Sequence, residues 1–403
     1  MEEIRAFLNR RTKDHSIAGA SLMIRRKGEL ICDFQCGYAD LKRGKHVEKN
    51  TMFRLASMTK PVIAIAVMML AEEGKLNLDD ELGNFLPQFK NMTVADRVVG
   101  FMEFYEPDPE NPAVPKVRND LLEGVCEVAA RNQITIRQML NHSSGMGQGP
   151  ISVTELERRL KPTQSLEERV NVIADTLLDF EPGTMTGYSA GTAYDVLGLL
   201  IERISGVDLN TFIQERICTP LKIYDLTFRP TMEQSARLCR LYEAGKDGMR
   251  DVTEEDPFWK LVDPVPGGYC SGSAGLLGTV EAYDRVAQML CNRGELDGVR
   301  LLSEETVEKM TWIEKVPHMQ MMPGAWWGLG MMVSEEPEKT HRSVGAGTFG
   351  WSGAYGTHFY IDPMQGITVV LGVNCSNIGG AGSPLSAELE HLIWKELSTD
   401  DKL

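Results

Sequence analysis

Short apolar stretches separated by polar turn residues occur near both ends of the chain and predict β-hairpins. Residues 17–24 and 29–38 form one pair, with an Arg-Arg-Lys-Gly turn between them. Residues 357–361 and 367–373 form another, joined by an Asp-Pro-Met-Gln-Gly turn. Hairpins at opposite ends predict one antiparallel sheet assembled from both termini. Residues 385–397 have apolar positions at helical spacing, so we expect this last helix to pack on the sheet.

The middle of the chain shows helical periodicity instead of strands. Glycine, proline or aspartate bounds each periodic segment, and these segments are residues 164–180, 192–204 and 207–217. Residues 105–115 hold four prolines in eleven positions, which predicts an irregular loop. Together these patterns predict a mostly helical insertion in the sheet domain.

The length of the chain agrees with this division. At roughly 100–200 residues per domain, 403 residues suggest two or three folding units. We expect an α/β fold of the α+β type, in which helices flank the antiparallel sheet. Residues 1–85 plus 265–403 would form this α/β domain, and residues 86–264 a mostly helical inserted domain.

Residues 58–73 predict a helix whose middle is apolar on all sides and therefore buried. Ser57 falls at the start of this helix, and Lys60 returns to the same face about one turn later. The unpaired N–H groups and positive field of a helix start favour an alkoxide and a neighbouring oxyanion. A lysine partly desolvated beneath a buried helix can act as a base. The pair is suited to be a nucleophile and its base, but Ser-x-x-Lys is common by chance, so the pair alone favours an N-cap serine beside a solvated lysine.

A second chemical signal is the Gly-Tyr-Ser-Ala-Gly segment at residues 187–191. It matches the Gly-x-Ser-x-Gly pattern of a nucleophile elbow centred on Ser189, which requires an apolar strand just before the serine. The Glu-Pro-Gly-Thr sequence at residues 181–184 predicts a turn instead, which disfavours the elbow. Tyr188 could act as a proton relay at the mouth of a loop, and an ordinary loop tyrosine is the remaining alternative.

A third signal is a glycine-rich segment at residues 345–363, in which five glycines precede a predicted strand. Gly353 would let a ligand lie close along the strand edge, with the Ala354 N–H pointing at it. A tight loop between two strands is the alternative interpretation.

Composition and charge exclude several classes of protein. Apolar residues make up 42% and charged residues 25%, which is typical of a globular chain and excludes a mainly disordered one. Lysine and arginine number 42 and aspartate and glutamate 57, which gives a formal charge of −15. Because a chain this acidic repels a phosphate backbone and has no basic stripe, we expect no nucleic-acid partner.

The sequence also lacks the usual signs of membrane insertion, export and metal binding. Its longest apolar run, residues 62–71, is about half of the ~20 residues that span a bilayer. The N-terminus has no signal-peptide pattern, and the eight cysteines are scattered without a Cys-x-x-Cys. None of the seven histidines has metal-ligand spacing. We therefore expect a cytoplasmic enzyme with reduced thiols, no membrane partner, no metal and no cofactor.

Three of these segments, in this order and spacing, resemble the motifs of the serine β-lactamase and penicillin-binding-protein-like family. Residues 57–60 match Ser-x-x-Lys, residues 188–190 match Tyr-x-Asn with a changed third position, and residues 351–353 stand at the Lys-Thr-Gly position. Flanking stretches also look familial, and these are residues 140–146, 272–280 and 294–303. The resemblance covers nearly the whole chain. It is closest to class C β-lactamase-related proteins and family VIII carboxylesterases, whose Trp-x-Gly matches the third motif.

The resemblance implies a β-lactamase/transpeptidase-like fold and a covalent acyl-enzyme mechanism. Ser57 would attack a carbonyl, while Lys60 and Tyr188 would take its proton and pass one to the leaving group. The backbone N–H groups of Ser57 and Ala354 would form the oxyanion hole. The residues implied to bind substrate are Ala190, Trp351, Ser352 and Gly353.

Two departures from the family motifs bear on the substrate. Ala190 lacks the amide that would bind the acylamino side chain of a β-lactam, and Trp351 replaces the cationic or imidazole residue that would meet a substrate carboxylate. We therefore expect a carboxylesterase, or an acyltransferase, acting on small to medium uncharged acyl esters. A weak β-lactamase, D-amino-acid amidase or D,D-peptidase acting on a small-molecule amide is the first alternative. A non-catalytic binding protein with the same fold is the second, although the intact Ser57, Lys60 and Tyr188 argue against it.

Overall fold

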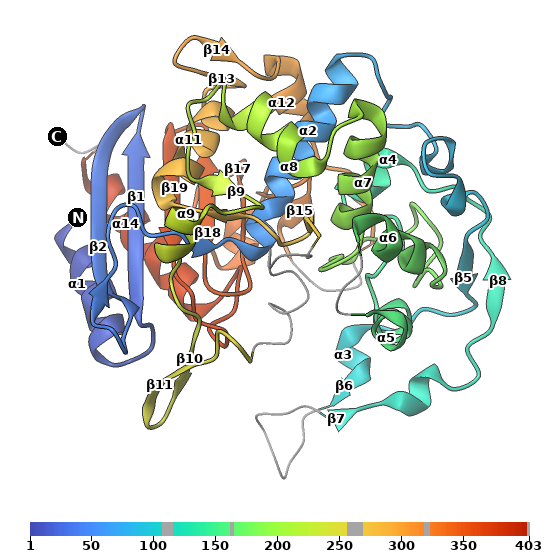
Figure 1. Ribbon diagram of the computed structural model, residues 1–403, viewed down its shortest axis with the longest axis horizontal. Helices are drawn as coiled ribbons and strands as arrows, with labels where there is room; N and C mark the ends of the chain where they lie inside the picture. The colour runs from blue at the N-terminus through green and yellow to red at the C-terminus, as the bar shows by residue number, and fades with distance from the viewer. Residues whose placement is uncertain (107–115, 162–164, 256–268, 318–322, 401–403) are drawn as a thin grey trace.

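A large antiparallel sheet occupies one side of the molecule (Figure 1). The computed structural model describes residues 1–106, 116–161, 165–255, 269–317 and 323–400. In spatial order the strands of the sheet are β15 (Ala325–Trp327), β16 (Met332–Ser334), β17 (Thr348–Ser352), β18 (His358–Asp362), β19 (Ile367–Gly372), β1 (Gly19–Arg26), β2 (Glu29–Asp40) and β3 (Lys45–His46). Since β1 pairs with both β2 and β19, the predicted sheet assembled from both termini is confirmed.

Helices flank this sheet and fill the other side of the molecule (Figure 1). The helices are α1 (Glu2–Lys13), α2 (Thr59–Glu72), α3 (Phe101–Phe104), α4 (Ile136–Leu140), α5 (Pro150–Arg159), α6 (Leu166–Ala174), α7 (Ala193–Ser205), α8 (Leu209–Ile213), α9 (Met232–Ala236), α11 (Val280–Cys291), α12 (Glu304–Thr311), α13 (Pro337–Thr340) and α14 (Pro384–Asp400). A single 3-10 turn, η1 (Ala56–Met58), precedes α2. The short strands are β4 (Phe53–Arg54), β5 (Thr93–Ala95), β6 (Tyr105–Glu106), β7 (Lys116–Val117), β8 (Glu127–Ala129), β9 (Leu226–Thr227), β10 (Tyr242–Gly245), β11 (Gly248–Asp251), β12 (Leu277–Gly278), β13 (Glu295–Leu296) and β14 (Val299–Arg300).

The two faces of the main sheet belong to two separate cores, because successive side chains of a strand point to opposite faces. α1 and α14 cover one face, and Tyr360 on β18 packs into the core beneath them with Leu389. Phe359, the preceding residue of β18, belongs instead to the core shared with α2 and α11. The predicted packing of a C-terminal helix on the sheet is confirmed by α14.

α2 lies between the sheet and the helical side of the molecule (Figure 1). Its residues from Thr59 to Leu70 are all buried, which confirms the predicted buried helix over residues 58–73. A helix that is apolar on every side must be shielded from water on every side, and η1, α7 and α8 pack against it. Ser57 lies in η1, so the predicted nucleophile precedes the α-helix by one tight turn.

The predicted helix over residues 164–180 is shorter in the structure. α6 ends at Ala174, where the Thr176 hydroxyl donates to the Ile173 carbonyl (2.7 Å). The chain then extends, and Leu178 forms a β-bridge with Val94. Local periodicity did not reveal this bridge because its partner comes from a distant segment. α7 matches the second predicted helix, whereas the third divides into α8 and a π-helical turn over Gln214–Cys218.

The division into two domains remains a prediction. β9 belongs to the predicted helical domain, yet it pairs with β12, which pairs with β4, both on the other side of the predicted boundaries. The boundary near residue 264 and most of the predicted loop at 105–115 lie outside the described residues. Within the described part of the chain, every helix is too short or too polar to cross a lipid bilayer.

A buried ion cluster lies on the face of the main sheet that α14 covers. Glu390 of α14 lies 3.1 Å from His358 Nε2 and accepts a hydrogen bond from Arg342 Nε (3.1 Å). Burial raises the pKa of the Glu390 carboxyl, but the His358 ring and the Arg342 guanidinium outweigh it and lower that pKa to about 2. The ionised carboxylate therefore stabilises the folded state.

This cluster predicts a pH dependence of stability. In the unfolded chain, without burial or these partners, the Glu390 pKa lies near 4.5, so the stabilisation is complete above that pH and is lost as the pH falls from 4.5 toward 2. The difference corresponds to about 3 kcal/mol at neutral pH. Urea unfolding of the wild type and of Glu390→Gln should therefore show a gap in unfolding free energy at pH 6 that narrows by pH 3.5. A gap of constant size between pH 6 and pH 3.5 would show that the ionised Glu390 carboxylate does not stabilise the folded state.

Candidate active site

Ser57 directly follows a strained residue in the turn η1. Ala56 has a φ of +46°, in the left-handed region that costs a non-glycine residue on the order of 1–3 kcal/mol. Remote bonds hold this backbone, since the Leu55 N–H donates to the Leu276 carbonyl (3.0 Å) and the Tyr283 hydroxyl donates to the Met58 carbonyl (2.8 Å). The surrounding structure therefore fixes the position of the predicted nucleophile.

Lys60, in the first turn of α2, is 1% exposed and has three polar neighbours. Its Nζ donates to the main-chain carbonyls of Ser273 (2.8 Å) and Ala190 (2.9 Å), and it lies 3.2 Å from Ser57 Oγ. The two carbonyls occupy two of the three directions in which the nitrogen can donate. The third direction faces Ser57 and holds an N–H of the ammonium or the lone pair of the neutral amine. This arrangement suits proton exchange between Lys60 and Ser57.

Tyr188 comes from the loop before α7 and lies against the same lysine. Its ring centroid is 5.0 Å from Lys60 Nζ, and its hydroxyl oxygen accepts a hydrogen bond from Trp351 Nε1 (3.0 Å). Its ring stacks on Trp327 with centroids 5.5 Å apart, and Trp327 in turn meets Trp351 edge to face. The structure thus brings Ser57, Lys60, Tyr188 and Trp351 together, beside a wall of aromatic rings.

His142 is a further buried residue of this wall, and it was not among the predicted site residues. Its ring contacts both Tyr188 and Trp327, and its Nδ1 accepts a hydrogen bond from the Ser189 N–H (3.2 Å). Burial, and then the charge of Lys60, hold the pKa of His142 well below its usual value. The imidazole is therefore neutral and shapes the site without adding charge. Its only signal in the sequence was its place in the familial stretch at residues 140–146.

The end of β17 packs closely against Leu55, the residue just before η1. A Cβ on Gly353 would lie 2.1 Å from Thr357 Oγ1 and 2.4 Å from the Leu55 carbonyl oxygen, so only glycine fits there. This close approach explains the glycine of the third motif and brings the turn at Ala354 beside η1. The roles of the Ser57 and Ala354 N–H groups in an oxyanion hole remain predictions.

The other residues predicted to bind substrate have different positions. Ala190 contributes its main-chain carbonyl to Lys60, as described above. Ser352 is not brought into the group around Ser57. Its hydroxyl bonds to His358 Nδ1 (2.7 Å) in the cluster beneath α14, on the face of β17 opposite to Trp351. Strand alternation places neighbouring residues on opposite faces, so the side chains of Trp351 and Ser352 point away from each other, and a role of Ser352 in substrate binding stays a prediction.

The alternative nucleophile, Ser189, is fully buried. Its Oγ lies 2.6 Å from Thr192 Oγ1 and accepts a hydrogen bond from the Ala193 N–H (3.0 Å) at the start of α7. Residues 181–188 contain no strand, so the strand–turn–helix context of a nucleophile elbow is absent from this described segment. These contacts describe a serine that supports the start of a helix.

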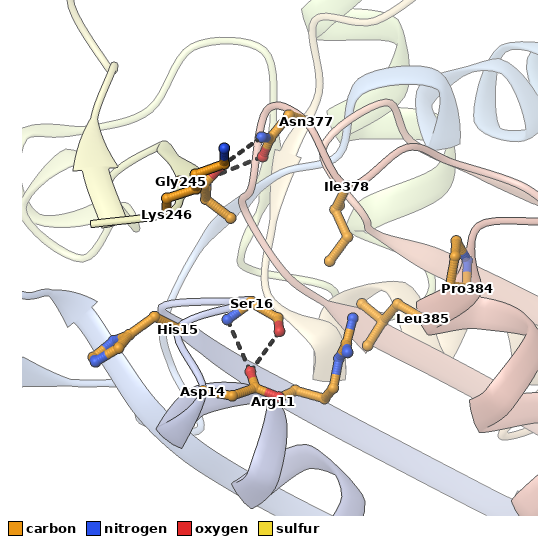
Figure 2. A pocket seen from close by; sticks show the side chains of 11 residues that line it. Arg11, Asp14, His15, Ser16, Gly245, Lys246, Asn377, Ile378, Pro384 and Leu385 are labelled. Carbon is orange, nitrogen blue, oxygen red and sulfur yellow. Dashed lines mark hydrogen bonds between the residues drawn. The ribbon is translucent and has the colours of Figure 1, made fainter. Parts of the chain in front are cut away.

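A separate cavity of about 570 Å³ opens between the end of α1, the β10–β11 hairpin and the start of α14 (Figure 2). Arg11, His15 and Lys246 give it a basic lining, and the Asp14 carboxylate accepts a hydrogen bond from the Ser16 N–H (3.0 Å). None of the predicted site residues lines it. Among the described residues, no group of three or more histidine, cysteine, aspartate or glutamate side chains could hold a metal ion.

Comparisons with known proteins find a family model, relatives and a solved structure that match most of this chain. The sequence model of the family described as Beta-lactamase matches residues 4–384. Protein Rv1367c of Mycobacterium tuberculosis is 30% identical, over 88% of this chain and 85% of that protein. Esterase EstB of Burkholderia gladioli is 26% identical, over 96% of this chain and 94% of that protein. The structure of EstCE1, a hydrolase with promiscuous acyltransferase activity, superposes with a TM-score of 0.77 at 23% identity, covering 98% of each chain.

Proposed function

This chain belongs to the beta-lactamase family, and on that premise we propose that it is a serine carboxylesterase that forms an acyl-enzyme on Ser57. The observation that carries the proposal is the position of Lys60, whose Nζ is held by two carbonyls and lies 3.2 Å from Ser57 Oγ. A serine hydroxyl needs a neighbouring base to become a nucleophile, and this geometry supplies one. The beta-lactamase-fold family includes esterases and acyltransferases among the relatives of this chain.

The proposed reaction has two halves. Ser57 Oγ attacks the ester carbonyl while its proton passes to the Lys60–Tyr188 pair, and the oxyanion binds the N–H groups of Ser57 and Ala354. The intermediate collapses as the alcohol leaves with a proton returned by the same pair. Water then attacks the acyl-enzyme with the pair again as base, which releases the carboxylic acid and restores Ser57. An alcohol in place of water would give acyl transfer.

The surroundings of Ser57 favour an uncharged acyl group. Trp327, Trp351 and the Tyr188 ring present aromatic surface, and the Ala190 methyl adds no hydrogen-bonding group. Tryptophan at position 351 supplies no cation for a carboxylate, and alanine at position 190 supplies no amide for an acylamino chain, so those groups of a β-lactam find no partner at these two positions. Small to medium uncharged acyl esters carry neither group, so they leave no polar atom without a hydrogen-bond partner there.

We therefore expect turnover of p-nitrophenyl butyrate to exceed that of nitrocefin. The expected ratio of kcat/KM is at least about two powers of ten, or ~2.7 kcal/mol in transition-state binding. Both substrates should be measured with one purified sample, together with D-Ala-p-nitroanilide. Nitrocefin hydrolysis that equals or exceeds ester hydrolysis would instead support the β-lactamase alternative. Ligand binding without turnover of any of the three would support a non-catalytic binding protein.

Acyl transfer is tested in the same assay. EstCE1 is described as a hydrolase with promiscuous acyltransferase activity, and its fold matches this chain. Adding a short alcohol to the p-nitrophenyl butyrate assay should give the butyrate ester of that alcohol, detectable by gas chromatography, if the acyl-enzyme admits an alcohol. Formation of butyric acid alone would restrict the proposal to hydrolysis.

A further inference from the structure

Asp195, in the first turn of α7, is completely buried and bonds to four donors. Its Oδ1 accepts hydrogen bonds from the Ser271 hydroxyl (2.8 Å) and the Ser273 N–H (2.9 Å). Its Oδ2 accepts from Arg169 Nε (2.7 Å) and from the Tyr269 hydroxyl (3.2 Å). The Arg169 side chain is 7% exposed, so this is an ion pair that burial makes costly unless every lone pair is used.

The ion pair connects to both carbonyls that hold Lys60. Asp195 binds the N–H of Ser273, whose carbonyl accepts from Lys60 Nζ (2.8 Å). Arg169 donates to the carbonyl of Gly191 (3.1 Å), the residue after Ala190, whose carbonyl also accepts from Lys60 (2.9 Å). The two loops that face the amine are thus fixed by one pair of buried charges.

The loop at residues 271–273 also lies directly on the start of α7. A Cβ on Gly272 would be 2.1 Å from the Tyr194 carbonyl oxygen, so no larger residue fits this contact. The Ser271 hydroxyl accepts a hydrogen bond from the Ala274 N–H (3.2 Å), which closes the turn around the Asp195 carboxylate. This packing leaves the loop little freedom as long as the carboxylate is present.

We propose that Asp195, held by Arg169, is a positioning residue that directs the Lys60 amine toward Ser57. Neither residue of this pair is among the groups that carry the proposed reaction. With two directions of the amine fixed by carbonyls, the third is directed at Ser57 Oγ, as the 3.2 Å separation requires. A displacement of a reacting group by about 1 Å can cost on the order of 10²-fold in rate. The inference rests on the proposed function and adds the source of the orientation that the reaction needs.

The test compares Asp195→Asn with Asp284→Asn. Asp284 of α11 is a matched control, because it is also buried and accepts from an arginine, Arg25 Nε (2.7 Å), but lies at the main sheet. The NH₂ group of an asparagine at position 195 would face either the two donors on Oδ1 or the two on Oδ2. Because two donors cannot bond to each other, one of the loops that holds Lys60 must move. Both variants should unfold at lower temperature. Only Asp195→Asn should also lower kcat for p-nitrophenyl butyrate, by about 10- to 100-fold, with KM within about threefold of wild type.

Phosphonylation of Ser57 by a fluorophosphonate provides a readout that needs no ester substrate. Its rate should fall in Asp195→Asn in parallel with kcat and stay near the wild-type rate in Asp284→Asn. If Asp195→Asn does not fold, Ser271→Ala removes one donor and should lower both rates by about 3- to 10-fold, roughly the effect of one hydrogen bond.

The outcomes separate the two proposals. A wild type that is phosphonylated but hydrolyses no ester overturns the esterase assignment, while the phosphonylation rates of the variants still decide the role of Asp195. Rates for the folded Asp195→Asn within twofold of those for Asp284→Asn, or a change in KM alone, overturn the positioning role. A wild type that is neither phosphonylated nor active overturns both.

Discussion

Replacing Ser57 with alanine is expected to abolish both ester turnover and phosphonylation. Loss of the attacking oxygen removes the covalent route, which costs at least about 10⁴-fold in kcat in serine hydrolases. Ser57 is small and partly reached by solvent, at 8% exposure, so the variant should keep its melting temperature. Turnover of p-nitrophenyl butyrate and in-gel fluorescence after fluorophosphonate treatment measure the two effects.

Ser189→Ala is the matched control for this experiment. Ser189 belongs to the Gly-x-Ser-x-Gly pattern, but its Oγ accepts from the Ala193 N–H at the start of α7. Its removal should therefore lower stability by about 1 kcal/mol, as for other helix-start serines, and leave labelling intact. If Ser189→Ala abolishes labelling and Ser57→Ala does not, the nucleophile has been assigned to the wrong serine.

Lys60→Arg is expected to be inactive although it preserves the positive charge. A guanidinium does not give up its proton, so it cannot serve as a base. Lys60→Ala and Tyr188→Phe should each lower kcat by at least about 10²-fold, the usual contribution of positioned proton transfer. Because both groups serve one step, the double variant should lose much less than the product of the single losses. Steady-state kinetics with p-nitrophenyl butyrate measure all four variants.

Lys49→Arg provides the control for the arginine substitution itself. Lys49 is half-exposed and lies 3.5 Å from both Asp33 and Glu281, so arginine can replace it at the surface. Its kcat should match that of wild type. A Lys60→Arg enzyme with near-normal kcat would show that the lysine contributes only its charge, and the role of base would then move to Tyr188.

Local sequence patterns predicted the elements in which neighbours along the chain decide the structure. The apolar run of α2 and the two hairpins that join in one sheet are of this kind. The short distance between Ser57 and Lys60 also follows from a spacing within one helical turn. α6 was predicted too long because the bridge from Leu178 to Val94 depends on a remote segment.

The groups that orient Lys60 could not be predicted in the same way. Two of its three partners are main-chain carbonyls, at Ala190 and Ser273, and a carbonyl has no residue type to recognise in a sequence. Their positions depend on Asp195, more than seventy residues away in sequence from the loop it binds. The orientation of Ser352, by contrast, could have been predicted from the sequence, because strand alternation alone places its side chain on the face opposite to Trp351.

The sheet that joins both ends of the chain determines when during synthesis the proposed active site can form. β1 needs β19 as its neighbour, and α1 meets α14 through the ion pair of Glu3 with Lys395 (2.7 Å). During synthesis Ser57 emerges from the ribosome early, whereas strands β17 to β19 and the helix α14 that covers them emerge much later. Until β19 is made, the N-terminal hairpin lacks the strand that pairs with the free edge of β1. The nascent chain therefore carries Ser57 long before it carries β17, whose Trp351 lies beside Tyr188 in the proposed site.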